Sequence, residues 1–142
     1  MTFNKSNSIY INMTIISNQL FYTKEHDWIL FTGTAAFTGI GRFKLTGIPG
    51  IDNIALFGYK PGDAIEEGAI LLNLHYREYT IPVFAPVAGM LLEVNPIVEK
   101  GLWDLIVKEP EQEGWLFKVA PLQKDNGHLL SSVFYKERLA PR

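Results

Sequence analysis

The segment from His75 to Tyr79 gathers side chains that could act in binding. It consists of His75, Tyr76, Arg77, Glu78 and Tyr79, and apolar runs flank it on both sides, so we expect it on an exposed hairpin turn. Tyrosine and arginine are typical anchors of protein interfaces, which makes this a candidate partner-binding hairpin. If strand geometry persists, His75, Arg77 and Tyr79 share one face, and Tyr76 and Glu78 share the other. Drift of an unselected polar turn explains the same residues equally well.

Other reactive side chains do not form a catalytic set in the sequence. The histidines at 26, 75 and 128 are far apart, and the run Glu25–Asp27 would alternate faces on a strand, so no metal site is expected. The adjacent Glu66 and Glu67 fit a solvated turn, and no base is indicated near Ser131 and Ser132. The chain has no cysteine, which excludes thiolate chemistry and disulfides. The sequence therefore predicts a protein that is not an enzyme.

Length and composition favour one globular domain. The chain has 142 residues, of which 47% are hydrophobic and 20% are charged. Its formal net charge of -2 gives no bulk attraction to nucleic acid or to anionic lipid, so neither is an expected partner. No apolar run approaches the roughly 20 residues that span a bilayer, and the first residues lack a secretory pattern. We expect a cytoplasmic protein.

Short apolar runs separated by glycine and proline predict mainly β structure, a sandwich or flattened barrel. A hairpin is expected where Gly33 and Thr34 separate two such runs, and residues 54–57 are expected to form a short buried strand. Pro82 cannot donate a ladder hydrogen bond, so its strand should lie at an edge or be bulged there. The predicted strands are 28–32, 35–38, 54–57, 69–74, 79–84, 89–94 and 116–119.

Helix is expected mainly at the carboxyl end, over about residues 127–139. Asp125 or Asn126 would cap this helix, and Leu129, Leu130, Val133 and Phe134 would form its apolar face. Basic residues at 136 and 138 suit its last turn. In contrast, the glycine and proline residues within 41–50 disfavour a continuous helix there.

Two motifs at opposite ends of the chain resemble those of the glycine cleavage system H protein, a lipoyl carrier of the biotinyl/lipoyl domain superfamily. The first is Tyr22–Trp28, Tyr-Thr-Lys-Glu-His-Asp-Trp, and the second is Glu109–Lys118, an acidic proline segment followed by Gly-Trp-Leu-Phe-Lys. Gly62-Asp63, Gly68 and Pro86–Gly89 follow the family's order between them. The resemblance implies a barrel-sandwich hybrid, a lipoyl-domain-like flattened barrel, with a C-terminal helix and few others.

The hairpin that bears the lipoyl-lysine in this family has no lysine here. The family's modified lysine lies sixteen residues after the glycine of the Gly-Asp turn and eight before the proline of the Pro-Val-x-Gly turn. Counts from Gly62 and from Pro86 both end at Glu78. Lipoyl transfer makes an amide with a primary amine, which neither Glu78 nor the neighbouring guanidinium of Arg77 supplies. Lys60, Lys108 and Lys118 are expected to be surface groups, the last two in a strand-like region.

The resemblance implies one H-protein-like domain over residues 13–142, preceded by an extension over residues 1–12. We expect no bound cofactor and a non-catalytic binding, scaffold or regulatory role toward a protein partner. In the family the carrier docks on glycine decarboxylase, an aminomethyltransferase and dihydrolipoamide dehydrogenase, so these or other lipoyl-dependent enzymes are the expected partners. Two alternatives stay open: a true lipoyl carrier with an unrecognised acceptor site, and an unrelated ligand-binding or enzymatic role.

Overall fold

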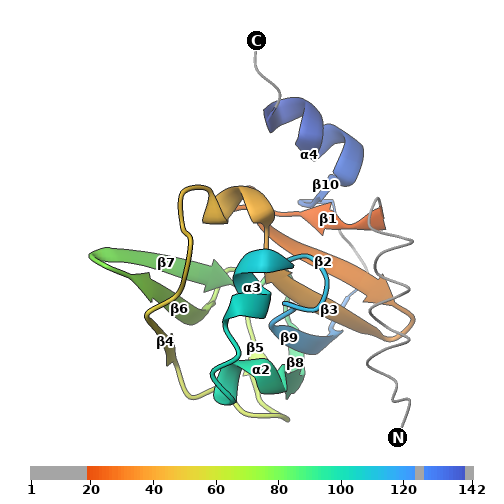
Figure 1. Ribbon diagram of the computed structural model, residues 1–142. Coiled ribbons are helices and arrows are strands. Elements are labelled where there is room, and N and C mark those ends of the chain that lie inside the picture. The colour runs from red at the N-terminus through yellow and green to blue at the C-terminus, as the bar shows by residue number, and fades with distance from the viewer. Residues whose placement is uncertain (1–18, 124–126, 140–142) are drawn as a thin grey trace, which may run out of the picture.

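The computed structural model describes residues 19–123 and 127–139, and the predicted extension at residues 1–12 and the predicted caps Asp125 and Asn126 lie outside them. The described chain forms two antiparallel sheets with short helices between strands (Figure 1). The elements are β1 (Phe21–Tyr22), β2 (Asp27–Thr32), β3 (Ala35–Ile40), η2 (Arg42–Leu45), β4 (Asn53–Leu56), β5 (Ala64–Ile65), β6 (Ile70–Tyr76), β7 (Tyr79–Phe84), β8 (Gly89–Val94), α2 (Pro96–Glu99), α3 (Asp104–Lys108), β9 (Phe117–Pro121), β10 (Leu130–Ser131) and α4 (Ser132–Leu139).

The strands divide into a larger and a smaller sheet. The larger sheet has seven strands in the order β10-β1-β2-β3-β9-β8-β5, and the smaller has three in the order β4-β6-β7. The predicted mainly β, lipoyl-domain-like sandwich with a C-terminal helix is confirmed, and the sheets do not close into a barrel. The smaller sheet projects to the side in Figure 1, with the β6–β7 turn at its far end.

Strand β2 explains how the core is divided. It is apolar on both faces: Ile29 packs into the main hydrophobic cluster, while Trp28 and Leu30 pack into a second one. A strand covered on both faces reads as a continuous apolar run, because neither set of alternate side chains meets water. The second cluster also contains Trp115 and Tyr135, so residues distant in sequence close the outer face of the larger sheet.

Two predicted hairpins are confirmed. β2 pairs with β3 through a turn in which Gly33 has a φ of 71°, a conformation that favours glycine. β6 pairs with β7, and β7 is an edge strand of the smaller sheet. Pro82 therefore lies at an edge, as its missing N–H requires.

The prediction that residues 54–57 form a buried strand is wrong about burial. β4 occupies Asn53–Leu56 but lies at the other edge of the smaller sheet, and Leu56 and Phe57 are exposed. Apolar residue types do not distinguish an edge strand from a central one, and the position in the sheet decides the exposure.

Two short helices, α2 and α3, were missed by the sequence analysis. Asn95 accepts the Ile97 N–H through its side chain, and Pro96 is the first residue of α2, so the Asn-Pro pair is a readable helix start. Lys108 lies in α3 and not in a strand-like region, whereas Lys118 lies in β9 as predicted. Within residues 41–50 the chain forms only the short 3₁₀ helix η2, in agreement with the prediction of no continuous helix.

The C-terminal helix is shorter than predicted and uses a different face. Its first residue is Ser132, because Leu130 and Ser131 pair with β1 as strand β10. The predicted apolar face is wrong at Val133 and Phe134, which are exposed. Figure 1 shows α4 above β1 and β10.

Tyr135 anchors α4 in place of the predicted face. Its ring stacks on that of Tyr22, with the centroids 3.9 Å apart, and its hydroxyl lies 2.7 Å from Nδ1 of His26. The predicted basic residues Lys136 and Arg138 do lie in the last turn. No helix among the described residues is long and apolar enough to cross a membrane.

Replacing Gly89 by alanine tests the packing of β8 against β9. An alanine Cβ at this position would overlap the backbone carbonyl of Ala120, which is part of the sheet and cannot rotate away. We expect a loss of about 1–3 kcal/mol in the free energy of unfolding, measured by urea denaturation. Gly50→Ala is the control, because nothing lies within 4 Å of a Cβ there. Equal stability of the two variants would contradict this packing.

Candidate functional site

The candidate partner-binding hairpin is the turn between β6 and β7. Tyr76 and Tyr79 form the last cross-strand pair, so Arg77 and Glu78 are the two loop residues. Arg77 has a φ of 54°, which is uncommon for a residue other than glycine and fits the first position of a tight hairpin turn. Arg77, Glu78 and Tyr79 are exposed, and the Tyr79 side chain is 56% accessible. The structure thus places Glu78 at the tip of an exposed hairpin.

The predicted sharing of faces across this turn is wrong. Cross-strand partners lie on the same face of a sheet, so Tyr76 and Tyr79 share one face. His75 pairs with Thr80 and therefore lies on the opposite face from Tyr79. The prediction assumed that side chains alternate between the two faces as in one continuous strand. The two-residue loop instead reverses the chain, so the alternation in β7 is set by its pairing with β6.

Asp52 holds the turn in place from outside the hairpin. Its carboxylate accepts a hydrogen bond from the Arg77 N–H at 2.7 Å, and its own N–H donates to the His75 carbonyl at 2.7 Å. These contacts connect the loop before β4 to the tip of β6–β7. Asp52 could not be identified from the sequence, because no local pattern indicates a contact with a residue 25 positions away.

The side chains of the tip remain available for contacts outside the chain. The Arg77 guanidinium carbon lies 5.2 Å from the centroid of the Tyr76 ring, a cation–π geometry. Among the described residues, the ion pairs involve neither Arg77 nor Glu78. The tip therefore offers an aromatic pair, a guanidinium and a carboxylate on a hairpin that Asp52 fixes.

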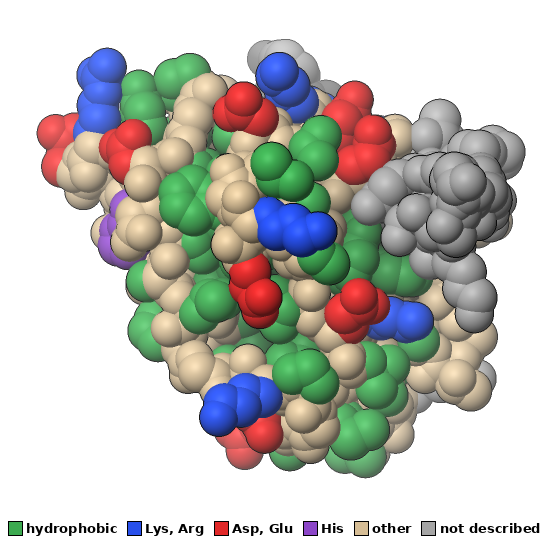
Figure 2. Space-filling view, turned by 60° about the horizontal axis from the view of Figure 1, so that its bottom comes forward, with side chains coloured by type: hydrophobic (Ala, Val, Ile, Leu, Met, Phe, Trp, Pro, Cys, Tyr) green, Lys and Arg blue, Asp and Glu red, His purple; other side chains and the backbone are tan. Residues whose placement is uncertain are grey.

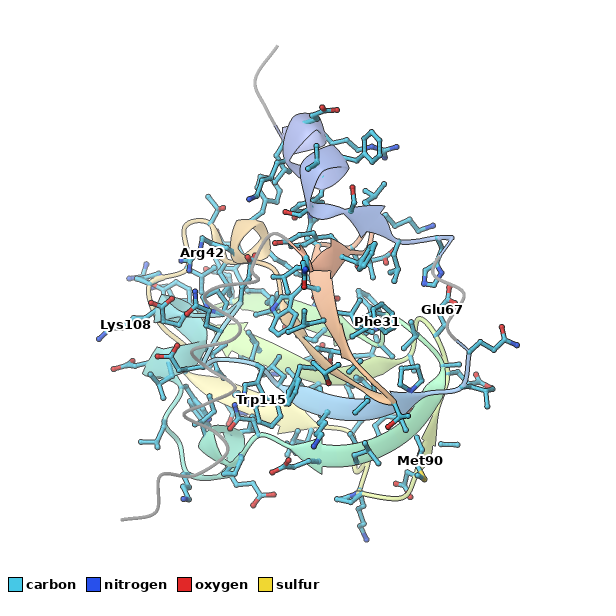
Figure 3. The ribbon with its side chains drawn as sticks, turned by 90° about the vertical axis from the view of Figure 1, so that its right-hand side faces the viewer. Phe31, Arg42, Glu67, Met90, Lys108 and Trp115 are labelled. Atoms are coloured by element: carbon cyan, nitrogen blue, oxygen red, sulfur yellow. The ribbon has the colours of Figure 1, made fainter. Side chains whose placement is uncertain are left out.

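The lysines that could replace a hairpin lysine lie elsewhere. The sequence contains none between Lys60 and Lys100. Lys60 is exposed beside a turn whose Asp63 carboxylate accepts its backbone N–H at 2.8 Å. Lys108 is exposed in α3, beside Arg42 in Figure 3, and the Lys118 ammonium lies 5.7 Å from the Phe37 ring. None of these positions resembles a projecting hairpin tip.

A buried ion pair lies at the base of β7. Asp27 is fully buried, and the Lys44 ammonium, from η2, donates to its carboxylate at 2.9 Å. The other carboxylate oxygen accepts the Phe84 N–H at 2.9 Å. Burial raises the pKa of Asp27 to about 6, while Lys44 and the Phe84 N–H, which stabilise the charged form, act in the opposite direction. Asp27 thus joins both sheets and η2 through one carboxylate.

The histidines considered for metal binding have other contacts. His26 faces the Tyr135 hydroxyl, and burial followed by the charge of Lys44 lowers its pKa. His128 lies 2.7 Å from the Pro86 carbonyl and 3.6 Å from the carboxylate of Glu67. Residues 19–123 and 127–139 contain no group of three potential ligands that could hold a metal ion.

A cavity of about 360 Å³ lies beside His128. Turn residues 23–25, the end of β7 at Phe84 and the Glu67–His128 pair line it. It brings together Glu67 and His128, which the sequence analysis treated separately. Glu66, by contrast, is exposed and does not line this cavity, so the two adjacent glutamates do not act together here.

The chain is similar to proteins of one family over most of its length. The family described as "Glycine cleavage H-protein" matches residues 20–140. The glycine cleavage system H protein of Bacteroides fragilis is 32% identical over 116 residues, covering 81% of this chain and 90% of that protein. The H protein of Thermus thermophilus is 30% identical over 125 residues, covering 87% and 95%.

A solved structure agrees with the fold. The crystal structure of a glycine cleavage system H protein from Mycobacterium marinum superposes with a TM-score of 0.72 at 22% sequence identity. The match covers 86% of this chain and 97% of that one. The arrangement of strands is therefore shared although most side chains differ.

Replacing Lys44 by methionine tests the buried pair. The change leaves the Asp27 carboxylate buried without a cation, so we expect a loss of about 3–5 kcal/mol in the free energy of unfolding at pH 7. The pKa of Asp27 should rise further above its unfolded value. A group with a raised folded pKa stabilises the fold at low pH and loses this contribution as pH rises, so the loss should shrink at pH 5.

Urea denaturation at pH 5 and pH 7 measures both effects. Lys60→Met is the matched control, because Lys60 is exposed and should change stability little at either pH. A loss in Lys44→Met that is the same at both pH values would show that Asp27 does not carry the effect.

Proposed function

Since this chain belongs to the glycine cleavage H-protein family, we propose that it uses the carrier fold as a non-catalytic protein-binding module that bears no lipoate. The observation that carries this proposal is Glu78 at the tip of the β6–β7 hairpin, where the family's lipoyl-lysine would project. The role is that of a scaffold or regulator, which needs a complementary surface and no covalent chemistry.

The residues of the tip do not fit lipoate. The cofactor is held by an amide bond to a primary amine, and a carboxylate at Glu78 has no amine to acylate. Arg77 is one position away, but a guanidinium stays protonated and is not such a nucleophile. Lys44, the lysine nearest to β7 by its contacts, has its ammonium in the buried pair with Asp27. We therefore derive no step of glycine decarboxylation through this chain.

Several features of the tip favour a maintained binding surface over drift. Arg77 is held in a left-handed conformation, which costs free energy, and Asp52 compensates by accepting its N–H. A turn under no constraint would more readily place glycine or asparagine at this position. An ordered tip also loses less entropy on association than a mobile one, which favours binding.

The proposed partners are the enzymes on which carriers of this family dock: glycine decarboxylase, the aminomethyltransferase and dihydrolipoamide dehydrogenase, or relatives of these. We place this association in the cytoplasm. Tyr76 and Tyr79 share a face and give the apolar contact, while Arg77 and Glu78 give the charged contacts that select the partner.

Binding of the purified chain to the three purified enzymes tests the proposal. We expect saturable binding to at least one enzyme, measured by biolayer interferometry, and at least tenfold weaker binding by an Arg77→Ala/Glu78→Ala variant. Lys60→Ala/Glu66→Ala is the control, since it also removes one cation and one anion from exposed positions. No binding to any enzyme, or equal binding by both double variants, would contradict the proposal.

A further inference from the structure

A small pocket lies next to the candidate hairpin. Its lining residues come from the loop before β4, from the segment between α2 and α3, and from the start of α3: Ile51, Gly101, Leu102, Trp103, Asp104 and Leu105. Its volume is about 280 Å³, slightly below the range of pockets that hold free small molecules. That size is sufficient for one large side chain.

The end of α2 fixes the rim of this pocket. Gly101 has a φ of 74°, and the Leu102 N–H donates to the Ile97 carbonyl at 3.0 Å, which is the pattern of a Schellman motif. The motif holds Leu102 in a set position although its side chain is 51% exposed. An exposed leucine held by its own backbone is a ready apolar contact for another molecule.

Trp103 gives the pocket an apolar wall. Its indole N–H donates to the Val98 carbonyl at 2.9 Å, so the only polar atom of the ring already has a partner. Trp103 and Leu105 also pack against the main hydrophobic cluster. The wall is therefore continuous with the core, and a side chain that enters the pocket loses contact with water without leaving an indole donor unsatisfied.

One loop, the segment before β4, takes part in both the pocket and the hairpin tip. Ile51 lines the pocket, and the next residue, Asp52, binds the Arg77 N–H. The loop before β4 thus contributes both to the pocket and to the contact that holds the hairpin tip.

The charge at the pocket indicates what kind of partner fits. Asp104 is exposed and lines it, and the ion pairs found among the described residues do not include it. A carboxylate without a cation, beside an apolar recess, is complementary to a basic residue next to an apolar one. Figure 2 shows a face of the molecule on which apolar, acidic and basic side chains are mixed, without a broad patch of one charge.

We propose that this pocket receives an apolar side chain of a partner protein, and that Asp104 pairs with a lysine or arginine adjacent to that side chain. The proposal rests on the proposed function of the hairpin as a docking element and gives the partner's chemistry at the same surface. The partner segment is expected to contain leucine, or a similar apolar residue, next to lysine or arginine.

Titration of the intact protein with blocked dipeptides tests the pocket directly. The probe is N-acetyl-Leu-Arg-amide, and the readout is the indole N–H signal of Trp103 in ¹H–¹⁵N NMR spectra. Trp28 and Trp115 are buried, so their indole signals serve as internal references. We expect a saturable shift of the Trp103 signal, with about tenfold weaker binding of N-acetyl-Gly-Arg-amide and about two- to fivefold weaker binding of N-acetyl-Leu-Glu-amide.

Three variants assign the contacts. Leu102→Gln should abolish the saturable shift, and Asp104→Asn should remove the preference for arginine over glutamate. Leu122→Gln changes another exposed leucine, outside this pocket, and should bind like the unchanged protein. No saturable shift with the leucine–arginine probe, or the same shift in Leu102→Gln, overturns the pocket proposal.

The two proposals fail separately. If an enzyme of the glycine cleavage system binds through Arg77 and Glu78 while the probe leaves Trp103 unchanged, the hairpin proposal stands and the pocket proposal falls. If the probe binds and none of the three enzymes does, the pocket proposal stands and the choice of partner enzymes is wrong.

Discussion

The carboxylate of Asp27 links both sheets and η2 by polar contacts, in addition to the hydrophobic core that the two sheets share. It belongs to β2 of the larger sheet, accepts the Phe84 N–H from β7 of the smaller sheet, and pairs with Lys44 of η2. Because it is fully buried, its charge is tolerated only while both partners are present. Together with the shared core, this contact helps to hold the smaller sheet and its projecting hairpin in place.

The hairpin is held at both ends. Asp27 fixes the base of β7, and Asp52 fixes the turn at Arg77. A swinging-arm carrier concentrates its reach in a flexible modified side chain, and here the corresponding position holds a short carboxylate on a constrained turn. We propose that this constrained turn is a fixed contact surface and that the pocket lined by Trp103 extends it.

Much of the fold could be predicted from the sequence, because the longer strands have clear apolar runs and the turns have glycine or proline. The distal motifs and the two spacings from Gly62 and Pro86 located Glu78 at the hairpin tip, where the structure places it. Strand β10 escaped notice because two residues are too few for a pattern, and its pairing with β1 moved the start of α4 to Ser132. Leu56 in β4 is exposed because this strand lies at the edge of its sheet, and the composition of the segment does not indicate that position.

The location of the candidate site could be predicted from the sequence, but the orientation and contacts of its residues could not. The sequence indicated that His75 to Tyr79 form the hairpin turn. It did not indicate which side chains share a face of the sheet, because the two-residue loop reverses the chain and changes the alternation of side chains between the two faces. The contacts of Asp52 with Arg77 and of Lys44 with Asp27 join segments separated by other elements, so no local pattern announces them. Both contacts involve ordinary surface residue types whose roles appear only when the fold brings their partners near.

Intact-mass spectrometry determines whether this chain, which has the H-protein fold, carries a lipoyl group. The full chain would be produced in cells that supply lipoate and a lipoate ligase, together with a lipoylated H protein as a positive control. We expect the mass of the unmodified polypeptide for this chain, while the control is modified. A mass increased by one lipoyl group would contradict this expectation and would require an acceptor outside the hairpin.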